Sequence, residues 1–216
     1  MSKNEIENSR ASGKNSDLLA AVAALQHGDV VVFPTETLYG LGADALNPVA
    51  VEKIFQLKGR DPNNPFPVLV GDFAMLDRLV SNIPALARRL MESFWPGPLT
   101  IILPARNDIP RPLVNRSGGI GLRISSAPIA TEVVKLLGRP VTATSANPSG
   151  REPARTVAEA QNYFSAVIDQ FVDGGTLSSR HGSTVIDVGA DHIKIIRAGE
   201  ITGAQIEAAS GAKVIA

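Results

Sequence analysis

Short apolar runs alternate along the chain with segments in which apolar residues recur three and four positions apart. A continuous apolar run bounded by turn residues is typical of a buried strand, and the wider spacing is typical of an amphipathic helix. The apolar runs predict strands over 30–33, 68–70, 99–103, 121–124, 141–144, 184–188 and 193–196. The helical spacing predicts helices over 18–26, 49–57, 73–80, 84–94, 128–137, 157–164 and 204–209. Segment 167–172 fits either a strand or a helix.

The predicted strands and helices interleave without an internal repeat or a change in composition. This order indicates a single α/β domain with a twisted, mixed β-sheet flanked by helices. The length of 216 residues suits one domain. Residues 1–15 are polar and lack the apolar stretch of a signal peptide. We therefore expect a flexible N-terminal tail followed by one domain over 16–216.

Charge and residue usage exclude several classes of protein. Lys and Arg total 21, as do Asp and Glu, so the formal net charge is zero and a non-specific nucleic-acid coat is disfavoured. The chain has no cysteine, which excludes a disulfide scaffold, a thiolate metal site and a cysteine nucleophile. No apolar run has the length of a membrane span, so we expect a cytoplasmic protein without a membrane partner.

Two turn-rich segments, 34–42 and 144–150, each follow a predicted strand and contain hydroxyl groups and glycines. Ligands of α/β proteins usually bind at the carboxyl ends of strands, so both segments suit a small polar ligand. Composition alone also allows two plain turns. The three histidines are scattered, and the sequence contains neither a Walker motif nor a nucleophile elbow. A zinc site and a Ser-His-Asp triad are therefore disfavoured.

Four cations occupy positions that favour an anionic ligand. Lys58 and Arg60 follow a predicted helix and could straddle a phosphate chain, although cations at a helix end also occur without a ligand. Arg123 and Arg197 accompany apolar strands and need either an anion or a salt bridge. Together these residues point to a polyanionic nucleotide and a small polar co-substrate. No general base stands out, which favours a nucleophile that is already charged.

The ordered motifs of this chain resemble those of the YrdC-type L-threonylcarbamoyladenylate synthases. The resemblance runs from about Leu18 to Ile201 and implies the short, single-domain form of that family, with a concave basic cavity. It rests on PTETLYGLG (34–42), KGR (58–60), WPGPLT (95–100), GLR (121–123), TSANPSG (144–150), STVID (183–187) and IIRAGEI (195–201). Each stretch is weak alone, but this order and spacing are highly specific.

The resemblance implies a nucleotidyltransferase reaction. L-threonine, bicarbonate and ATP would give threonylcarbamoyl-AMP and pyrophosphate, and other proteins would transfer the threonylcarbamoyl group to adenosine 37 of tRNA. The carboxylate of threonine carbamate would attack the α-phosphate. We expect Mg²⁺ to accompany ATP, and we expect no prosthetic group and no metal held by the protein itself.

The resemblance also implies two sets of site residues. Lys58 and Arg60 would be the catalytic residues that hold phosphate oxygens. ATP would be bound by Lys58, Arg60, Ser145, Asn147 and Arg197. Threonine would be bound by Thr35, Tyr39, Arg123 and Ser183. The chain departs from the family pattern at Asp61, where the family often has proline, and at Gly71 and Ala127, where many members carry histidine.

Two other functions compete with this interpretation. A YrdC-like paralogue could use the same chemistry with another acceptor, and the departure at Gly71 favours that possibility. Alternatively, the concave face could bind double-stranded RNA or tRNA, although zero net charge and an aromatic content of 5% argue against binding by base stacking. A domain that acts on carbamoyl phosphate in hydrogenase maturation is disfavoured, because such domains accompany zinc-finger segments and this chain has no cysteine.

Overall fold

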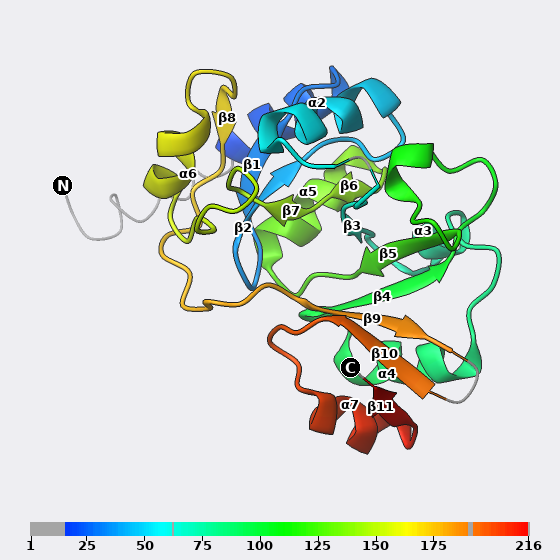
Figure 1. Cartoon of the computed structure of the whole chain (residues 1–216). Helices are drawn as coiled ribbons and strands as arrows, with labels where there is room; N and C mark the ends of the chain where they lie inside the picture. Colours follow the sequence, from blue (N-terminus) through cyan, green and yellow to red (C-terminus); the bar gives the residue numbers. More distant parts are fainter. Residues whose placement is uncertain (1–15, 62, 190–191, 216) are drawn as a thin grey trace.

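The computed structural model describes residues 16–61, 63–189 and 192–215. The tail expected over 1–15 lies outside these residues. Figure 1 shows two β-sheets with helices packed around them. The predicted α/β class, mixed strand directions and flanking helices are confirmed, but the strands form two sheets and not one. Within the described residues, no helix is long and apolar enough to cross a membrane.

The smaller sheet has the strand order β7-β2-β1-β8. Its strands are β1 (Val31–Pro34), β2 (Tyr39–Gly42), β7 (Thr144–Ser145) and β8 (Gln170–Phe171). Strands β1 and β2 form an antiparallel hairpin in which all eight residues are buried. The sequence predicted a turn-rich segment over 34–42 and not β2, because the two glycines of this strand resemble turn residues. Segment 167–172 contributes a strand, β8.

The larger sheet has the strand order β11-β10-β9-β4-β5-β3-β6. Its strands are β3 (Val68–Leu69), β4 (Leu99–Pro104), β5 (Gly119–Arg123), β6 (Val141–Thr142), β9 (Thr184–Val188), β10 (His192–Arg197) and β11 (Lys213–Ile215). Parallel and antiparallel pairs alternate across it. Strand β11 was not predicted.

The chain passes from one sheet to the other at Ala143. The sequence predicted one strand over 141–144, but β6 pairs with β3 in the larger sheet, whereas β7 pairs with β2 in the smaller one. Between the two strands, the Ala143 amide donates to the Pro67 carbonyl oxygen over 2.9 Å. This crossing joins the two sheets through one short segment of the chain.

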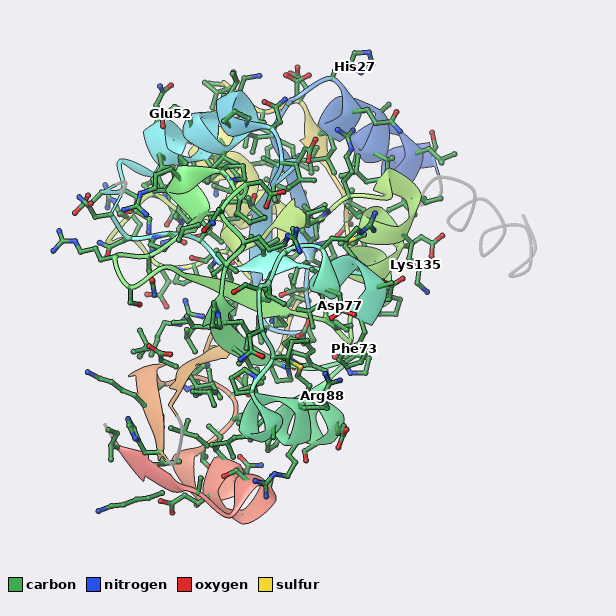
Figure 2. The ribbon with its side chains drawn as sticks, turned by 90° about the vertical axis from the view of Figure 1, so that its right-hand side faces the viewer. His27, Glu52, Phe73, Asp77, Arg88 and Lys135 are labelled. Atoms are coloured by element: carbon green, nitrogen blue, oxygen red, sulfur yellow. The ribbon has the colours of Figure 1, made fainter. Side chains whose placement is uncertain are left out.

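The helices pack around the two sheets (Figure 1). Besides a helix over 16–26 they are α2 (Pro48–Lys58), α3 (Phe73–Asp77), α4 (Ala85–Phe94), α5 (Pro128–Leu137), α6 (Val157–Phe164) and α7 (Gly203–Ser210), with a short 3₁₀ helix, η1 (Arg111–Leu113). Helix α2 lies at the top of the view in Figure 1, and α4 and α7 lie at the bottom. Helices α4 and α7 pack against each other beneath the larger sheet. Figure 2 shows Asp77 of α3, Arg88 of α4 and Lys135 of α5 on one side of the molecule.

Local signals explain most helix ends. Helix α5 begins with Pro128 and ends before Gly138, which has the left-handed φ of 67° that favours glycine. Asp72 caps α3 by accepting from the Met75 amide over 2.7 Å. The expectation that α3 extends to residue 80 was wrong. The helix ends at Asp77, because Val80 forms a β-bridge with Ala105.

Candidate active site

A cavity of about 250 Å³ lies between the two sheets, next to the β1–β2 turn. We call it the hairpin cavity. It is lined by Thr35, Thr37, Leu38, Tyr39, Gly40, Arg123, Ala143, Thr144, Ser145, Pro153, Arg180, His181, Gly182, Ser183, Arg197 and Ala198. Six of the nine predicted site residues therefore line this cavity: Thr35, Tyr39, Arg123, Ser145, Ser183 and Arg197.

A second cavity of about 380 Å³ adjoins the first. We call it the strand cavity, because residues of β4, β5, β9 and β10 form much of its wall. Arg60, Phe66 and Asn115 line it together with backbone at Gly119 and Gly121. Arg197 lines both cavities. A ligand that spans the two cavities would therefore pass this guanidinium.

A β-bulge in β10 precedes Arg197. Ile195 pairs with Ile186 and Arg197 pairs with Val185, so Ile196 is the extra residue. A bulge re-aims the side chain that follows it. The Nη2 atom of Arg197 donates to the main-chain oxygen of Ser183 over 2.7 Å and lies 3.1 Å from its Oγ. Arg197 is thereby anchored to the end of the neighbouring strand.

Three guanidinium groups influence one another across the two cavities. Burial lowers the pKa of Arg197, and the positive charges of Arg123 and Arg60 lower it further. Burial likewise lowers the pKa of Arg60. The Nε of Arg60 donates to the main-chain oxygen of Asn64 over 2.8 Å, and its guanidinium lies 5.2 Å from the centre of the Phe66 ring. Mutually repelling cations held in this way favour an anionic ligand.

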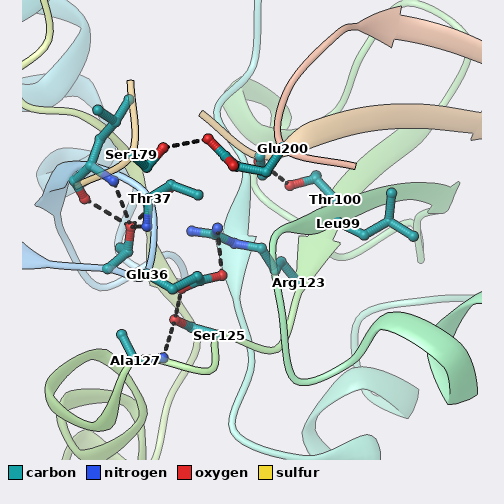
Figure 3. Close-up of polar contacts among 12 residues, drawn as sticks. Glu36, Thr37, Leu99, Thr100, Arg123, Ser125, Ala127, Ser179 and Glu200 are labelled. Carbon is teal, nitrogen blue, oxygen red and sulfur yellow. Dashed lines mark hydrogen bonds and ion pairs between the residues drawn. The ribbon is translucent and has the colours of Figure 1, made fainter. Parts of the chain in front are cut away.

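Arg123 is paired with a carboxylate, Glu36, that was not among the predicted site residues. Its Nη1 donates to the Oε1 of Glu36 over 2.9 Å (Figure 3). The second oxygen of Glu36 accepts a hydrogen bond from the Oγ of Ser125. The Arg123 side chain is only 4% exposed, and its buried Nε has no hydrogen-bond partner. No local signal marks Glu36, because its partners lie far away in the sequence.

Lys58 is buried beside the two cavities and does not line either of them. Its Nζ donates to the main-chain oxygens of Ser145 and Asn147 over 2.6 and 2.7 Å. Burial, helped by the charge of Arg60, lowers the pKa of Lys58 to about 7. The structure therefore gives Lys58 a second task besides the predicted phosphate contact, which is to hold the segment that follows β7.

Asn147 belongs to the same loop and is also absent from both cavity walls. Its Nδ2 donates to the main-chain oxygens of Pro148 and Arg151 over 3.0 and 2.7 Å. The Ser149 amide donates to the Lys58 carbonyl oxygen over 2.9 Å. These bonds shape the loop after β7, and the ATP contacts expected of Lys58 and Asn147 stay predictions.

The two site residues predicted in the β1–β2 hairpin, Thr35 in the turn and Tyr39 at the start of β2, use their hydroxyl groups within the protein. The Oγ1 of Thr35 donates to the Leu38 carbonyl oxygen over 2.8 Å and accepts from the Leu38 amide. The hydroxyl of Tyr39 donates to the Gly175 carbonyl oxygen over 2.8 Å and accepts from the Gly174 amide. Threonine contacts by these two side chains stay predictions.

The positions that depart from the family pattern lie outside both cavities. Asp61, Gly71 and Ala127 are absent from the two sets of lining residues. Ala127 precedes α5, and its amide donates to the Ser125 Oγ over 3.2 Å. Among the described residues, no group of three or more His, Cys, Asp and Glu side chains is placed to hold a metal ion.

Known proteins share this sequence and fold. A family model named Sua5_yciO_yrdC and described as telomere recombination matches residues 23–199. The chain is 40% identical over 202 residues to the threonylcarbamoyl-AMP synthase of Bacillus subtilis, covering 93% of this chain and 58% of that protein. It is 32% identical to a putative threonylcarbamoyl-AMP synthase of Mycobacterium tuberculosis, covering 89% of this chain and 88% of that protein.

Two solved structures have the same fold. The crystal structure of Pyrococcus abyssi Sua5 complexed with L-threonine matches with a TM-score of 0.87 and 35% identity, over 92% of this chain and 58% of that one. Escherichia coli YciO matches with a TM-score of 0.77 and 29% identity, over 86% of this chain and 90% of that one. The chain thus spans less than two thirds of the length of the Bacillus and Pyrococcus relatives.

Proposed function

This chain belongs to the Sua5/YciO/YrdC family, and on that premise we propose that it is an L-threonylcarbamoyladenylate synthase. It would join L-threonine, bicarbonate and ATP into threonylcarbamoyl-AMP and release pyrophosphate. Relatives named threonylcarbamoyl-AMP synthase and a Pyrococcus structure with bound L-threonine support this activity. The product would serve other proteins that modify adenosine 37 of tRNA, and a cytoplasmic location belongs to the same proposal.

The observation that carries the proposal is the position of Arg197 at the junction of two cavities. The reaction needs two substrates that meet at one phosphorus atom. Arg123 in the hairpin cavity suits the carboxylate of an amino acid, and Arg60 in the strand cavity suits phosphate oxygens. Arg197 lies between them and could stabilise the negative charge that develops where the two substrates react.

The strand cavity suits the nucleoside end of ATP. Phe66 and Ile102 provide apolar surface, and Asn115 provides an amide nitrogen that can donate, while its Oδ1 accepts from Ser117 and Gly119. Gly119 and Gly121 leave the floor of the cavity free of side chains. Most ligand pockets combine apolar walls with a few polar groups in this way. The triphosphate would then extend from this cavity toward Arg197.

The proposed mechanism requires little proton chemistry from the protein. The threonine amine and bicarbonate form a carbamate with loss of water, and a carbamate oxygen attacks the α-phosphorus. The bond between this phosphorus and the bridging oxygen breaks, and pyrophosphate leaves with the electron pair. Positioning alone can lower such a barrier by about 7–11 kcal/mol. The guanidinium groups of Arg60 and Arg197 would orient the phosphates and neutralise their charge.

The triphosphate would arrive with Mg²⁺, an ion that neutralises part of the phosphate charge when bound. The phosphate oxygens are hard ligands that suit this ion. The carboxylate of Glu36, beside the hairpin cavity, is not free to bind it, because this carboxylate is already paired with Arg123 and Ser125. We therefore infer that Mg²⁺ is held mainly by the substrate.

The deciding experiment measures pyrophosphate release by the pure protein with ATP and Mg²⁺, while threonine or bicarbonate is omitted in turn. Release that needs both co-substrates supports the synthase. Release that needs bicarbonate and a different amino acid would identify a paralogue with another acceptor. No release in any combination, with salt-sensitive binding of tRNA, would favour the RNA-binding alternative.

A further inference from the structure

Glu36 and Ser125 lie behind Arg123 as seen from the hairpin cavity. Arg123 lines this cavity, whereas Glu36 and Ser125 do not. Figure 3 shows the Glu36 carboxylate between the Arg123 guanidinium and the Ser125 hydroxyl. The Ser125 Oγ accepts from the Ala127 amide over 3.2 Å, just before α5 begins. The carboxylate therefore connects the β1–β2 turn of the smaller sheet to β5 and α5.

This pair leaves one edge of the Arg123 guanidinium for a ligand. Glu36 occupies Nη1, while Nε is buried and unpaired. A buried donor without a partner is costly, and an acceptor supplied by a ligand would remove this cost. In arginine, Nε and Nη2 form one edge of the planar fork, which fits the two oxygens of a carboxylate. The free edge can therefore accept one carboxylate in a fixed orientation.

The charge of Glu36 also distinguishes Arg123 from the other site cations. Within the described part of the chain, Lys58, Arg60 and Arg197 form no ion pair with a carboxylate, whereas Arg123 does. Coulomb repulsion scales with the charge of the incoming group. A polyphosphate is therefore repelled by Glu36 more strongly than an amino acid, whose single carboxylate is balanced by its ammonium group.

We propose that Glu36 is a positioning and specificity residue that reserves Arg123 for a monoanionic carboxylate and directs polyphosphate to Arg60 and Arg197. This inference rests on the proposed function, because it assigns the two anions of that reaction to different arginines. Glu36 acts through Arg123 and touches no reacting atom. Without it, the three guanidinium groups would form one continuous polyanion site.

The test measures the binding of L-threonine and of pyrophosphate, alone and together, by calorimetry. In the wild type we expect the two ligands to bind side by side, without weakening each other. In Glu36→Gln, which keeps an oxygen acceptor but removes the charge, pyrophosphate binds more tightly and competes with L-threonine. We expect the ratio of the two dissociation constants to shift by about tenfold toward pyrophosphate, as for coupled charges in one network.

Two further variants separate this role from a structural one. Ser125→Ala frees one oxygen of Glu36 but keeps its charge, so we expect weaker L-threonine binding with unchanged pyrophosphate binding. Asp44→Asn removes a buried carboxylate that pairs with Arg139 outside both cavities and is the matched control. If Glu36 had only a structural role, Glu36→Gln would weaken the binding of both ligands to the same extent as Asp44→Asn, and the two ligands would not compete. That result would overturn the inference.

The pyrophosphate measurement also separates this inference from the proposed function. If the wild-type chain bound no L-threonine and released no pyrophosphate from ATP, the proposed function would fail. Tighter pyrophosphate binding by Glu36→Gln would still support the role of Glu36 in directing anions. Unchanged or weaker pyrophosphate binding would overturn it whether or not the synthase reaction occurs.

Discussion

The Nζ atom of Lys58 lies 2.7 Å from the main-chain oxygen of Asn147, although the two residues are 89 positions apart in the sequence. The same ammonium group binds the Ser145 carbonyl oxygen at 2.6 Å. The final residue of α2 thus fixes the loop that follows β7. Because Ser145 lines the hairpin cavity, the position of this cavity wall depends on Lys58.

Replacing Lys58 by methionine keeps the apolar stem and removes the ammonium group. We expect the loop over 145–151 to exchange its amide hydrogens faster, while the rest of the fold keeps its protection. Misplaced site groups can cost about 10²-fold in rate, so pyrophosphate release should fall at least that far. Lys53→Met is the matched control, because Lys53 lies on α2 and binds Gly28 and Asp29. Full activity in Lys58→Met would contradict this role.

Nucleotide binding should take up protons just above neutral pH. Burial and the charge of Arg60 lower the pKa of Lys58 to about 7, so much of the free protein carries a neutral amine there. A bound triphosphate favours the ammonium form and raises this pKa. At more acidic pH the amine is protonated in both states, and the uptake disappears. Calorimetry in buffers of different ionisation enthalpy measures the effect.

The difference between the wild type and Lys58→Met isolates the contribution of this amine from protons exchanged by the nucleotide itself. Equal proton uptake by the two proteins would show that Lys58 does not titrate on binding.

Arg60→Ala should abolish adenylate formation and leave the fold intact, because this side chain is partly exposed and reaches over Phe66 from the edge of the strand cavity. Arg60→Lys should keep the positive charge but lose the hydrogen bond to Asn64 and the planar contact with Phe66. We therefore expect weak nucleotide binding and low activity in Arg60→Lys. Equilibrium binding of ATP and circular dichroism check both points, with exposed Arg116→Ala as the control.

Gly199→Ala should distort the site, because the added Cβ would displace the backbone of a neighbouring segment. A Cβ at this position would lie 2.5 Å from the Ser183 carbonyl carbon and the Thr184 amide nitrogen, so the strand ends must separate. Ser183 holds Arg197, and we expect lower activity together with a lower melting temperature. Gly203→Ala is the comparison, because its Cβ would meet Ile195 at an ordinary 3.4 Å. Equal behaviour of the two variants would contradict this explanation.

Tyr39→Phe tests whether this hydroxyl serves the ligand or the fold. The hydroxyl bonds Gly174 and Gly175, and burial raises its pKa to about 12, so it stays neutral at physiological pH. Loss of these bonds should cost about 1–3 kcal/mol of unfolding free energy, measured with urea. Unchanged L-threonine affinity would assign the hydroxyl to the fold and contradict the predicted threonine contact. Weaker L-threonine binding at unchanged stability would instead place the hydroxyl in the ligand site.

Features governed by neighbouring residues were predictable from the sequence. Helix α5 occupies 128–137 as predicted, because proline starts it and glycine ends it. The interruption at Ala143 was not predictable, because it depends on β2 and β3 as partners. The sequence likewise indicated the site cations but not their partners. That Glu36 pairs with Arg123 and that Lys58 binds the loop after β7 are consequences of tertiary folding.

The strand order of the smaller sheet determines the stage of protein synthesis at which the chain can first bind its ligands. Strand β1 leaves the ribosome early, yet its parallel partner β8 and the partner of β2 are made much later. Until then both edges of the hairpin present unpaired backbone N–H and C=O groups, with which other chains can pair. Arg197 follows later still. The nascent chain therefore gains both cavities in one late step, after a long interval in which chaperones could bind it.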